Sequence, residues 1–111
     1  TRHGYGELAK SKALDLWQPD ITWCGGITAA LQIMDIANKE NIPVVPHRGG
    51  EPWGLHFIAS TQCENLAEIL PGSKDAPRDD LWIGEKTTLN GFTHPSDKSG
   101  FGVYPNPDLI P

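Results

Sequence analysis

The sequence predicts an α/β fold in which short parallel strands alternate with helices. Apolar runs at 14–17, 42–47 and 65–70 are each preceded by a stretch rich in helix formers or with helical spacing of apolar residues. The connections between the runs are long enough for right-handed strand-helix-strand units, which build a parallel sheet covered by helices. Both a barrel and a doubly wound sheet fit this pattern.

The first unit spans residues 4–20. The segment "GYGELAKSKA" (4–13) has helix formers after Gly6, whereas Gly4-Tyr5-Gly6 is interpreted as a turn because no strand or further phosphate-loop glycine accompanies it. The run Leu14, Leu16, Trp17 then predicts a buried strand that ends near Asp20.

The second unit follows the break at Gly25-Gly26. Thr28 is expected to cap or open a helix, in which Ala29, Ile33, Ile36 and Ala37 fall at helical spacing and which "NKEN" closes. The segment "IPVVPH" (42–47) then predicts a second buried strand that Pro46 and His47 stop.

The third unit and the tail complete the chain. A helix is expected over 53–62 and a third strand over 65–70. Residues 71–80 form a polar loop with proline and glycine, and Asn90-Gly91 is the strongest short-range signal for a hairpin. The expected division is therefore a part with alternating helices and strands, 1–70, and a C-terminal part, 71–111, with a loop, a hairpin and an irregular tail that includes Gly100-Phe101-Gly102 as a turn.

Composition excludes several classes of partner. The 111 residues are 38% hydrophobic and carry a formal net charge of −5, without the clustered positive charge that nucleic acid or an anionic membrane needs. No apolar stretch is long enough to cross a bilayer, and no secretion signal is visible at the start, so a cytoplasmic protein is expected. Cys24 and Cys63 have neither metal-ligand nor redox spacing and are expected to be neutral thiols. The start at Thr1 suggests a fragment.

Three polar residues mark the ends of the predicted strands. Asp20 follows the first, His47 the second, and Glu68 lies near the end of the third. Since ligands of parallel sheets bind at the carboxyl ends of the strands, all three are expected at one rim. A carboxylate beside an imidazole fixes its tautomer and raises its basicity, which makes a general base. The alternative is that each residue merely ends a strand or caps a helix.

Other candidates are weaker. His56 and His94 lack the spacing of zinc ligands. "RGGEPWG" (48–54) places Arg48 directly after His47, where it can line a polar substrate or belong to a flexible turn. Trp23 and Trp53 fall in presumed rim loops, although tryptophan is more often part of a core or a pocket wall.

The residues themselves resemble a known family. In order and spacing, "QPDITWCGGITAA", "IPVVPH", "LAEIL", "LNGF" and "SGFGV" are similar to the carboxyl-terminal part of the mandelate racemase branch of the enolase superfamily. The separation of 27 positions between Asp20 and His47 matches that branch's Asp-His dyad. "WCGG", "PH" and "GFGV" resemble acid-sugar dehydratases of the L-rhamnonate dehydratase type.

The resemblance implies a partial (β/α)₈ TIM barrel to which this chain contributes the last three strand-helix units. It implies a reaction in which Mg²⁺ holds the carboxylate of a sugar acid, a base removes the adjacent proton, and water leaves to give a 2-keto-3-deoxy acid. On matching positions His47 is the base, Asp20 its orienting partner, and Glu68 the acid that hydrogen-bonds the enolate.

The resemblance also sets expectations about what lies elsewhere. The Mg²⁺ ligands and the capping domain are expected upstream of Thr1, so the isolated chain is expected to lack a metal site and activity, while the full-length enzyme is expected to be a homo-oligomeric hydro-lyase. Two alternatives stay open. One is a racemase or another dehydratase of the same superfamily; the other is a non-catalytic binding module derived from a barrel.

Overall fold

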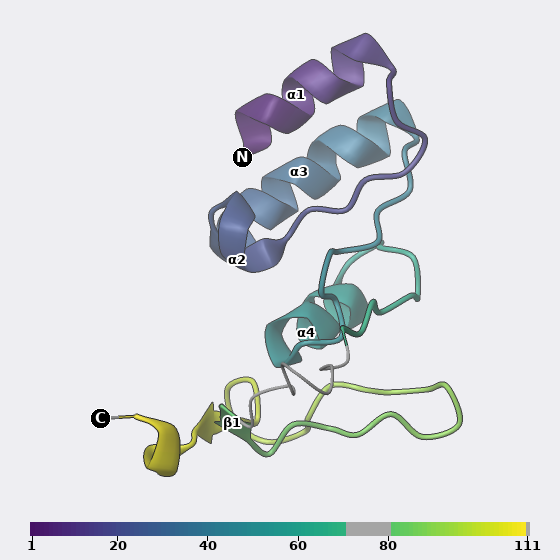
Figure 1. Ribbon diagram of the computed structural model, residues 1–111. Coiled ribbons are helices and arrows are strands. Elements are labelled where there is room, and N and C mark those ends of the chain that lie inside the picture. Colours follow the sequence, from purple (N-terminus) through teal and green to yellow (C-terminus); the bar gives the residue numbers. More distant parts are fainter. Residues whose placement is uncertain (71–80, 111) are drawn as a thin grey trace.

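The computed structural model describes residues 1–70 and 81–110 and has an elongated shape of 46 × 28 × 26 Å (Figure 1). Two helices lie side by side at one end, a third helix lies below them, and the C-terminal segment forms the opposite end. In chain order the elements are α1 (Arg2–Ser11), α2 (Ile21–Cys24), α3 (Gly26–Glu40), α4 (Pro52–Ser60), β1 (Trp82–Ile83), β2 (Tyr104–Pro105) and the 3₁₀ helix η1 (Pro107–Leu109).

The core lies where α1 and α3 pack over the chain between them. Helix α3 buries Ala30, Ile33, Met34 and Ala37, which recur at the spacing of one helical face. Trp17 is fully buried below these helices, and its ring centroid lies 5.0 Å from that of Tyr5 in α1. The predicted helix is therefore confirmed, and Ile33 and Ala37 are buried as expected, whereas Ala29 and Ile36 are only half-buried.

Parallel pairing joins the first two predicted strands, but neither is a full strand. Trp17 pairs with Val44 and Asp20 with His47 as isolated parallel bridges, and the His47 N–H donates to the Pro19 carbonyl at 3.1 Å. The predicted parallel direction is correct, whereas the predicted strand extents are wrong. Prolines at 19 and 43 explain the short ladder, since each lacks a backbone N–H on the side that faces the other segment.

The predicted strand over 65–70 is also wrong. Residues 65–70 form no strand. Two separate backbone hydrogen bonds join this part of the chain to the second predicted strand and the turn after it. The Glu64 N–H donates to the Val44 carbonyl at 3.0 Å, and the Gly50 N–H donates to the Glu68 carbonyl at 2.9 Å. A tight bond from the Leu66 N–H to the Glu64 carbonyl bends the chain between them, so no regular ladder forms.

Several helix bounds differ from the expectation, and one helix is new. Helix α4, expected over 53–62, ends two residues earlier, at Ser60. Gly4 and Gly6 lie inside α1, where the packing of Tyr5 on Trp17 outweighs a helix penalty of about 1 kcal/mol per glycine. Helix α3 begins after Gly25, which has a left-handed φ of 119°, and Thr28 lies within the helix. The short helix α2 was not predicted, because four residues are too few to show a period.

The C-terminal segment packs on α4. The rings of Trp53 and Trp82 meet edge to face at 5.8 Å, and those of His56 and Phe101 at 5.6 Å. Strands β1 and β2 pair antiparallel, which was not predicted from so short a pattern. The predicted loop over 71–80 lies outside the described residues.

The Asn90-Gly91 hairpin is confirmed. Leu89 and Phe92 exchange two backbone hydrogen bonds of 2.8 and 2.9 Å. Asn90 and Gly91 have φ of 52° and 81°, as a two-residue turn with both central residues left-handed requires. The turn at Gly100-Phe101-Gly102 is also present.

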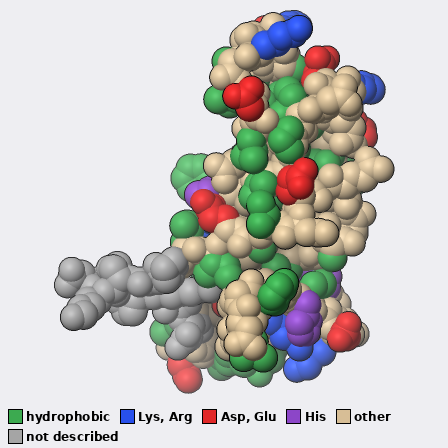
Figure 2. Space-filling model, turned by 90° about the vertical axis from the view of Figure 1, so that its right-hand side faces the viewer, with side chains coloured by type: hydrophobic (Ala, Val, Ile, Leu, Met, Phe, Trp, Pro, Cys, Tyr) green, Lys and Arg blue, Asp and Glu red, His purple; other side chains and the backbone are tan. Residues whose placement is uncertain are grey.

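Large apolar side chains remain exposed on the described surface. Figure 2 shows such side chains along one face, from the helices at one end toward the C-terminal segment. The exposed set includes Leu14, Leu16, Leu31, Leu66, Ile69, Leu70, Leu89 and Phe92. Extended apolar surface of this kind is typical of a face that contacts further protein. Within residues 1–70 and 81–110, no helix has the length and apolar character to span a membrane.

Candidate active site

The candidate site forms where the chain turns after the parallel bridges. Asp20 and His47 stand opposite each other as bridge partners, and both line an open hollow of about 230 Å³. Trp23, Arg48 and Leu70 complete its lining. The backbone pairing brings the ends of the first two predicted strands together at one rim, as the sequence indicated.

His47 is held by Glu68. The imidazole Nδ1 lies 2.7 Å from the carboxylate Oε2, and the two side chains are 42% and 32% exposed. The same oxygen accepts the Arg48 N–H at 2.8 Å. The third predicted site residue therefore reaches the rim even though its segment is not a strand.

Asp20 is engaged elsewhere. Its Oδ1 accepts the Thr22 N–H at 2.8 Å, the Thr22 hydroxyl at 2.6 Å and the Trp23 N–H at 3.2 Å, and so caps α2. Among the described residues, no hydrogen bond or ion pair joins this carboxylate to His47. The structure thus shows the capping interaction that the sequence offered as an alternative for Asp20, and it places the residue at the rim as well.

The turn after His47 is compact because it contains glycine. Arg48 takes a left-handed φ of 55°, and its guanidinium pairs with the Glu51 carboxylate. A Cβ on Gly50 would lie 2.6 Å from Ile69 Cγ1 and 3.0 Å from the Glu68 carbonyl. Glycine at this position therefore permits the 66–70 segment to approach closely enough for Glu68 to reach His47.

Trp23 and Leu70 form part of the wall of the hollow. The sequence analysis placed Trp23 in a rim loop but did not single out Leu70. Trp23 is 86% exposed, which is unusual for tryptophan and leaves its ring free to face a ligand. Leu70 was missed, although the alternation of an extended chain places it on the same side as Glu68.

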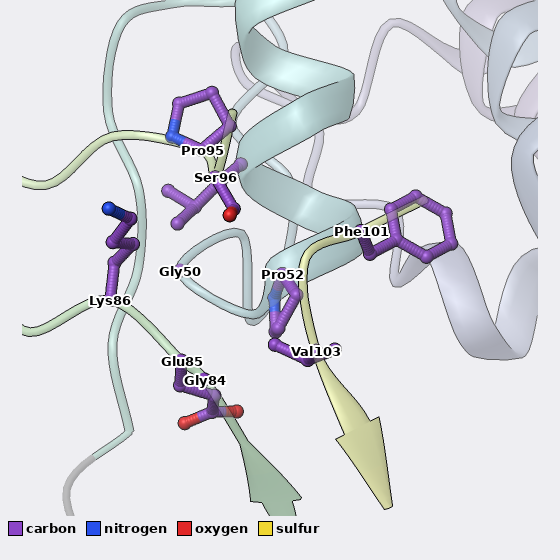
Figure 3. Close-up of a pocket in the computed structure, with 10 residues that line it drawn as sticks. Gly50, Pro52, Gly84, Glu85, Lys86, Pro95, Ser96, Phe101 and Val103 are labelled. Carbon is purple, nitrogen blue, oxygen red and sulfur yellow. The ribbon is translucent and has the colours of Figure 1, made fainter. Parts of the chain in front are cut away.

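A second hollow lies behind the turn. Figure 3 shows Gly50 and Pro52 facing residues of the C-terminal segment, among them Ser96, Phe101 and Val103. Its volume is about 10 Å³, which is room for one water at most. It is a packing gap between α4 and the C-terminal segment, and the rim beside His47 is the better candidate for a ligand.

Neither cysteine belongs to the site chemistry. Burial raises the pKa of the Cys24 thiol and of the Cys63 thiol. Cys63 Sγ lies 3.4 Å from Met34 Sδ in the core. Both side chains are buried free thiols, as expected from their spacing.

Residues 1–109 match the family model described as "Enolase C-terminal domain-like". The chain belongs to this enolase family. The described residues therefore have the fold of the enolase C-terminal, TIM-barrel-like domain, and the resemblance seen in the sequence is confirmed. The number of barrel strands that the chain contributes stays a prediction.

Two solved structures resemble the enolase-family chain. L-rhamnonate dehydratase from Gibberella zeae matches with a TM-score of 0.82 and 35% identity over 97% of the chain. A mandelate racemase/muconate lactonizing enzyme from Roseovarius nubinhibens ISM matches with a TM-score of 0.71 and 26% identity over 94% of the chain. The chain spans 29% of the length of each. Both structures are named as enzymes, which supports an enzyme family for this chain.

Proposed function

We propose that the protein containing these residues is an acid-sugar dehydratase of the L-rhamnonate dehydratase type. One observation carries the proposal: a histidine held by a carboxylate stands at an open rim in a chain 35% identical to an L-rhamnonate dehydratase. An imidazole with one nitrogen engaged and the other free to face a ligand is suited to remove a proton from carbon.

The proposed reaction uses His47 twice. Nε2 accepts the proton next to the substrate carboxylate, and the electron pair of the broken C–H bond enters the carboxylate as an enediolate. The C–O bond at the next carbon then breaks, and the protonated imidazole returns the proton to the leaving hydroxide as water. The resulting enol tautomerises to the 2-keto-3-deoxy acid.

Three other residues contribute to substrate binding in this proposal. Arg48 lines the same rim, and its guanidinium, which pairs with Glu51, could bind a carboxylate or hydroxyl of the sugar acid if it turned from Glu51 toward the hollow. The exposed ring of Trp23 can pack against its carbon chain. Asp20 keeps a second carboxylate oxygen, Oδ2, for the imidazole or the substrate, since the cap uses Oδ1.

The resemblance also implies Mg²⁺, and the described residues do not fit such a site. Within residues 1–70 and 81–110, no group of three His, Cys, Asp or Glu side chains could hold a metal ion. Octahedral Mg²⁺ sites are built on carboxylates supplemented by water and substrate oxygens. Ligands for the proposed Mg²⁺ would therefore be residues other than these, and the proton transfers proposed above use only this chain's side chains.

A test combines a panel of sugar acids with solvent deuterium. The protein is incubated with each acid in D₂O and Mg²⁺, and products are followed by NMR and by a colour reaction for 2-keto acids. His47→Asn should lower the rates of both deuterium incorporation and keto-acid formation by about 10²-fold or more. His3→Asn, at an exposed position in α1, is the matched control and should leave both unchanged.

The outcomes separate the alternatives. Keto-acid formation that depends on His47 supports the dehydratase. Deuterium incorporation with inverted configuration and no keto acid would indicate a racemase. Turnover that survives His47→Asn would contradict the mechanism.

A further inference from the structure

The Asn90-Gly91 hairpin carries a candidate site of covalent modification at its tip. Both residues are exposed, and a Cβ built on Gly91 would meet nothing within 4 Å. Figure 1 shows this part of the chain, in yellow-green, as a loop that extends away from the helices. The tip is therefore open to solvent within the described part of the chain.

An asparagine side chain can react with the backbone of the residue that follows it. The backbone nitrogen of that residue loses its proton to hydroxide and attacks the carbon of the side-chain amide. A C–N bond forms to close a succinimide ring, the bond to the NH₂ group breaks, and ammonia leaves. Water then opens the ring at either carbonyl, which gives aspartate or isoaspartate, and in isoaspartate the backbone runs through the former side chain.

Gly91 is suited to this attack for two reasons. Glycine has no Cβ to obstruct the approach of its nitrogen to the neighbouring side chain. Among the described residues, no hydrogen bond engages the Gly91 N–H, since the two cross-turn bonds use the amides of Leu89 and Phe92. The nitrogen therefore gives up no bond within this part of the chain before it attacks.

Asn41 provides the contrast within the same chain. It also has a left-handed φ, of 56° against 52° at Asn90, but the residue that follows it is Ile42. The branched side chain of Ile42 crowds the attack, and its N–H already donates to the Ala37 carbonyl at 2.9 Å. The two asparagines thus share a left-handed φ and differ in the access to the amide that follows.

Ring closure also requires the turn to open, because the Asn90 side chain must rotate onto the Gly91 nitrogen. The turn is held by the two bonds between Leu89 and Phe92, whose side chains are 73% and 80% exposed. A short hairpin with so little buried apolar surface opens at low cost in free energy. We propose that Asn90 is a site of spontaneous deamidation, which converts the hairpin tip to aspartate and isoaspartate.

The two products should affect the hairpin differently. Aspartate tolerates the left-handed φ of the turn, so it only adds a negative charge to a chain of formal net charge −5. Isoaspartate lengthens the backbone by a methylene, so the two-residue turn no longer brings Leu89 and Phe92 opposite each other. No residue of the rim takes part, and the inference is therefore independent of the proposed function.

The test is to age the purified protein at neutral and at mildly alkaline pH and to digest it for mass spectrometry. We expect the peptide with Asn90 to gain the mass that replacement of NH₂ by OH brings, and to become a substrate for an isoaspartate-specific carboxyl methyltransferase. Conversion should be faster at the higher pH, because hydroxide removes the Gly91 proton. Peptides that contain Asn38, Asn41 or Asn65 should stay unmodified over the same time.

Asn90→Gly is the matched control variant. Glycine suits the left-handed turn and has no side-chain amide, so this variant should show neither the mass gain nor the methylation. Its Leu89 and Phe92 amides should stay as protected from deuterium exchange after ageing as before. In the aged parent protein, the isoaspartate fraction should lose this protection.

The inference would be overturned if Asn90 stayed unmodified in the aged protein, or if the mass gain and methylation persisted in Asn90→Gly. Conversion at Asn41 as fast as at Asn90 would show that access to the following amide does not decide the reaction. Isoaspartate at position 90 with both cross-turn amides still protected would contradict the expected effect on the turn.

Discussion

Replacing Gly54 by alanine should destabilise the protein, although alanine is the better helix former. Gly54 lies in α4, and a Cβ built on it would lie 2.5 Å from the Gly49 carbonyl oxygen and 2.8 Å from Gly49 C and Cα. These are backbone atoms, so no side-chain rotation can relieve the contact. The helix must move away from the turn that follows His47.

The magnitude follows from two opposing effects. Alanine gains up to about 1 kcal/mol over glycine within a helix. Overpacking of a closely packed site costs about 1–3 kcal/mol, and contact with backbone favours the upper end. The free energy of unfolding should therefore fall by about 1–2 kcal/mol in Gly54→Ala.

Gly6→Ala provides the matched control. Gly6 also lies inside a helix, α1, but a Cβ there meets nothing within 4 Å. Only the propensity effect remains, so this variant should gain about 0.5–1 kcal/mol. Urea unfolding followed by circular dichroism measures both changes, with an unchanged slope in urea showing that the midpoint reports stability.

The reasoning would be refuted if Gly54→Ala were as stable as the parent protein while Gly6→Ala gained stability as expected. That result would mean that α4 and the turn can separate at no cost. The close approach of α4 would then have no part in holding the rim.

Three further predictions concern the core, the thiols and the hairpin. Ile33→Ala, at a fully buried position of α3, should lower the free energy of unfolding by about 2–5 kcal/mol. Leu31→Ala on the same helix, where the side chain is 46% exposed, should lower it clearly less. Urea unfolding measures both changes. Burial raises the pKa of Cys24 and Cys63 above the ordinary value of 9.0, so at alkaline pH the native state holds protons that the unfolded state has lost, and stability should fall as pH rises above about 9. The thermal midpoint measured from pH 7 to 10.5 should decline less steeply in the double cysteine-to-alanine variant; equal slopes would contradict this cause. Gly91→Ala places a residue with a side chain at a backbone φ of 81° and should destabilise the hairpin by about 1 kcal/mol. The expected result is faster deuterium exchange at the two cross-turn amides, with exchange elsewhere in the chain as the control.

Local chemistry made part of the fold predictable. Asn90-Gly91 specifies a two-residue turn because its backbone angles suit these residue types, whatever surrounds them. The apolar spacing of Ile33 and Ala37 indicates which face of α3 is buried, because a helix repeats with a fixed period. Family membership was also visible, since it rests on the order and spacing of motifs.

Strand content depended on pairing that residue patterns do not show. The apolar run at 42–47 predicted a strand, yet Pro43 cannot donate toward the first segment, Pro46 cannot donate toward the segment on the other side, and only isolated bridges form. The segment over 65–70 has two backbone bonds to its neighbour and no ladder. Helix α2 was not predicted because four residues are too few to show a helical period, which leaves the cap by Asp20 as its main signal.

The sequence by itself determined that Asp20, His47 and Glu68 come near the ends of consecutive segments, because parallel connections return each segment to the same edge. Only the tertiary structure decided which oxygen meets which nitrogen. Glu68 Oε2 meets His47 Nδ1 and Asp20 Oδ1 meets the amides of α2, since these contacts depend on a left-handed turn at Arg48 and a close approach at Gly50. Contacts of 2.7–2.8 Å demand placement to within a few tenths of an ångström, and such placement comes from packing across the chain.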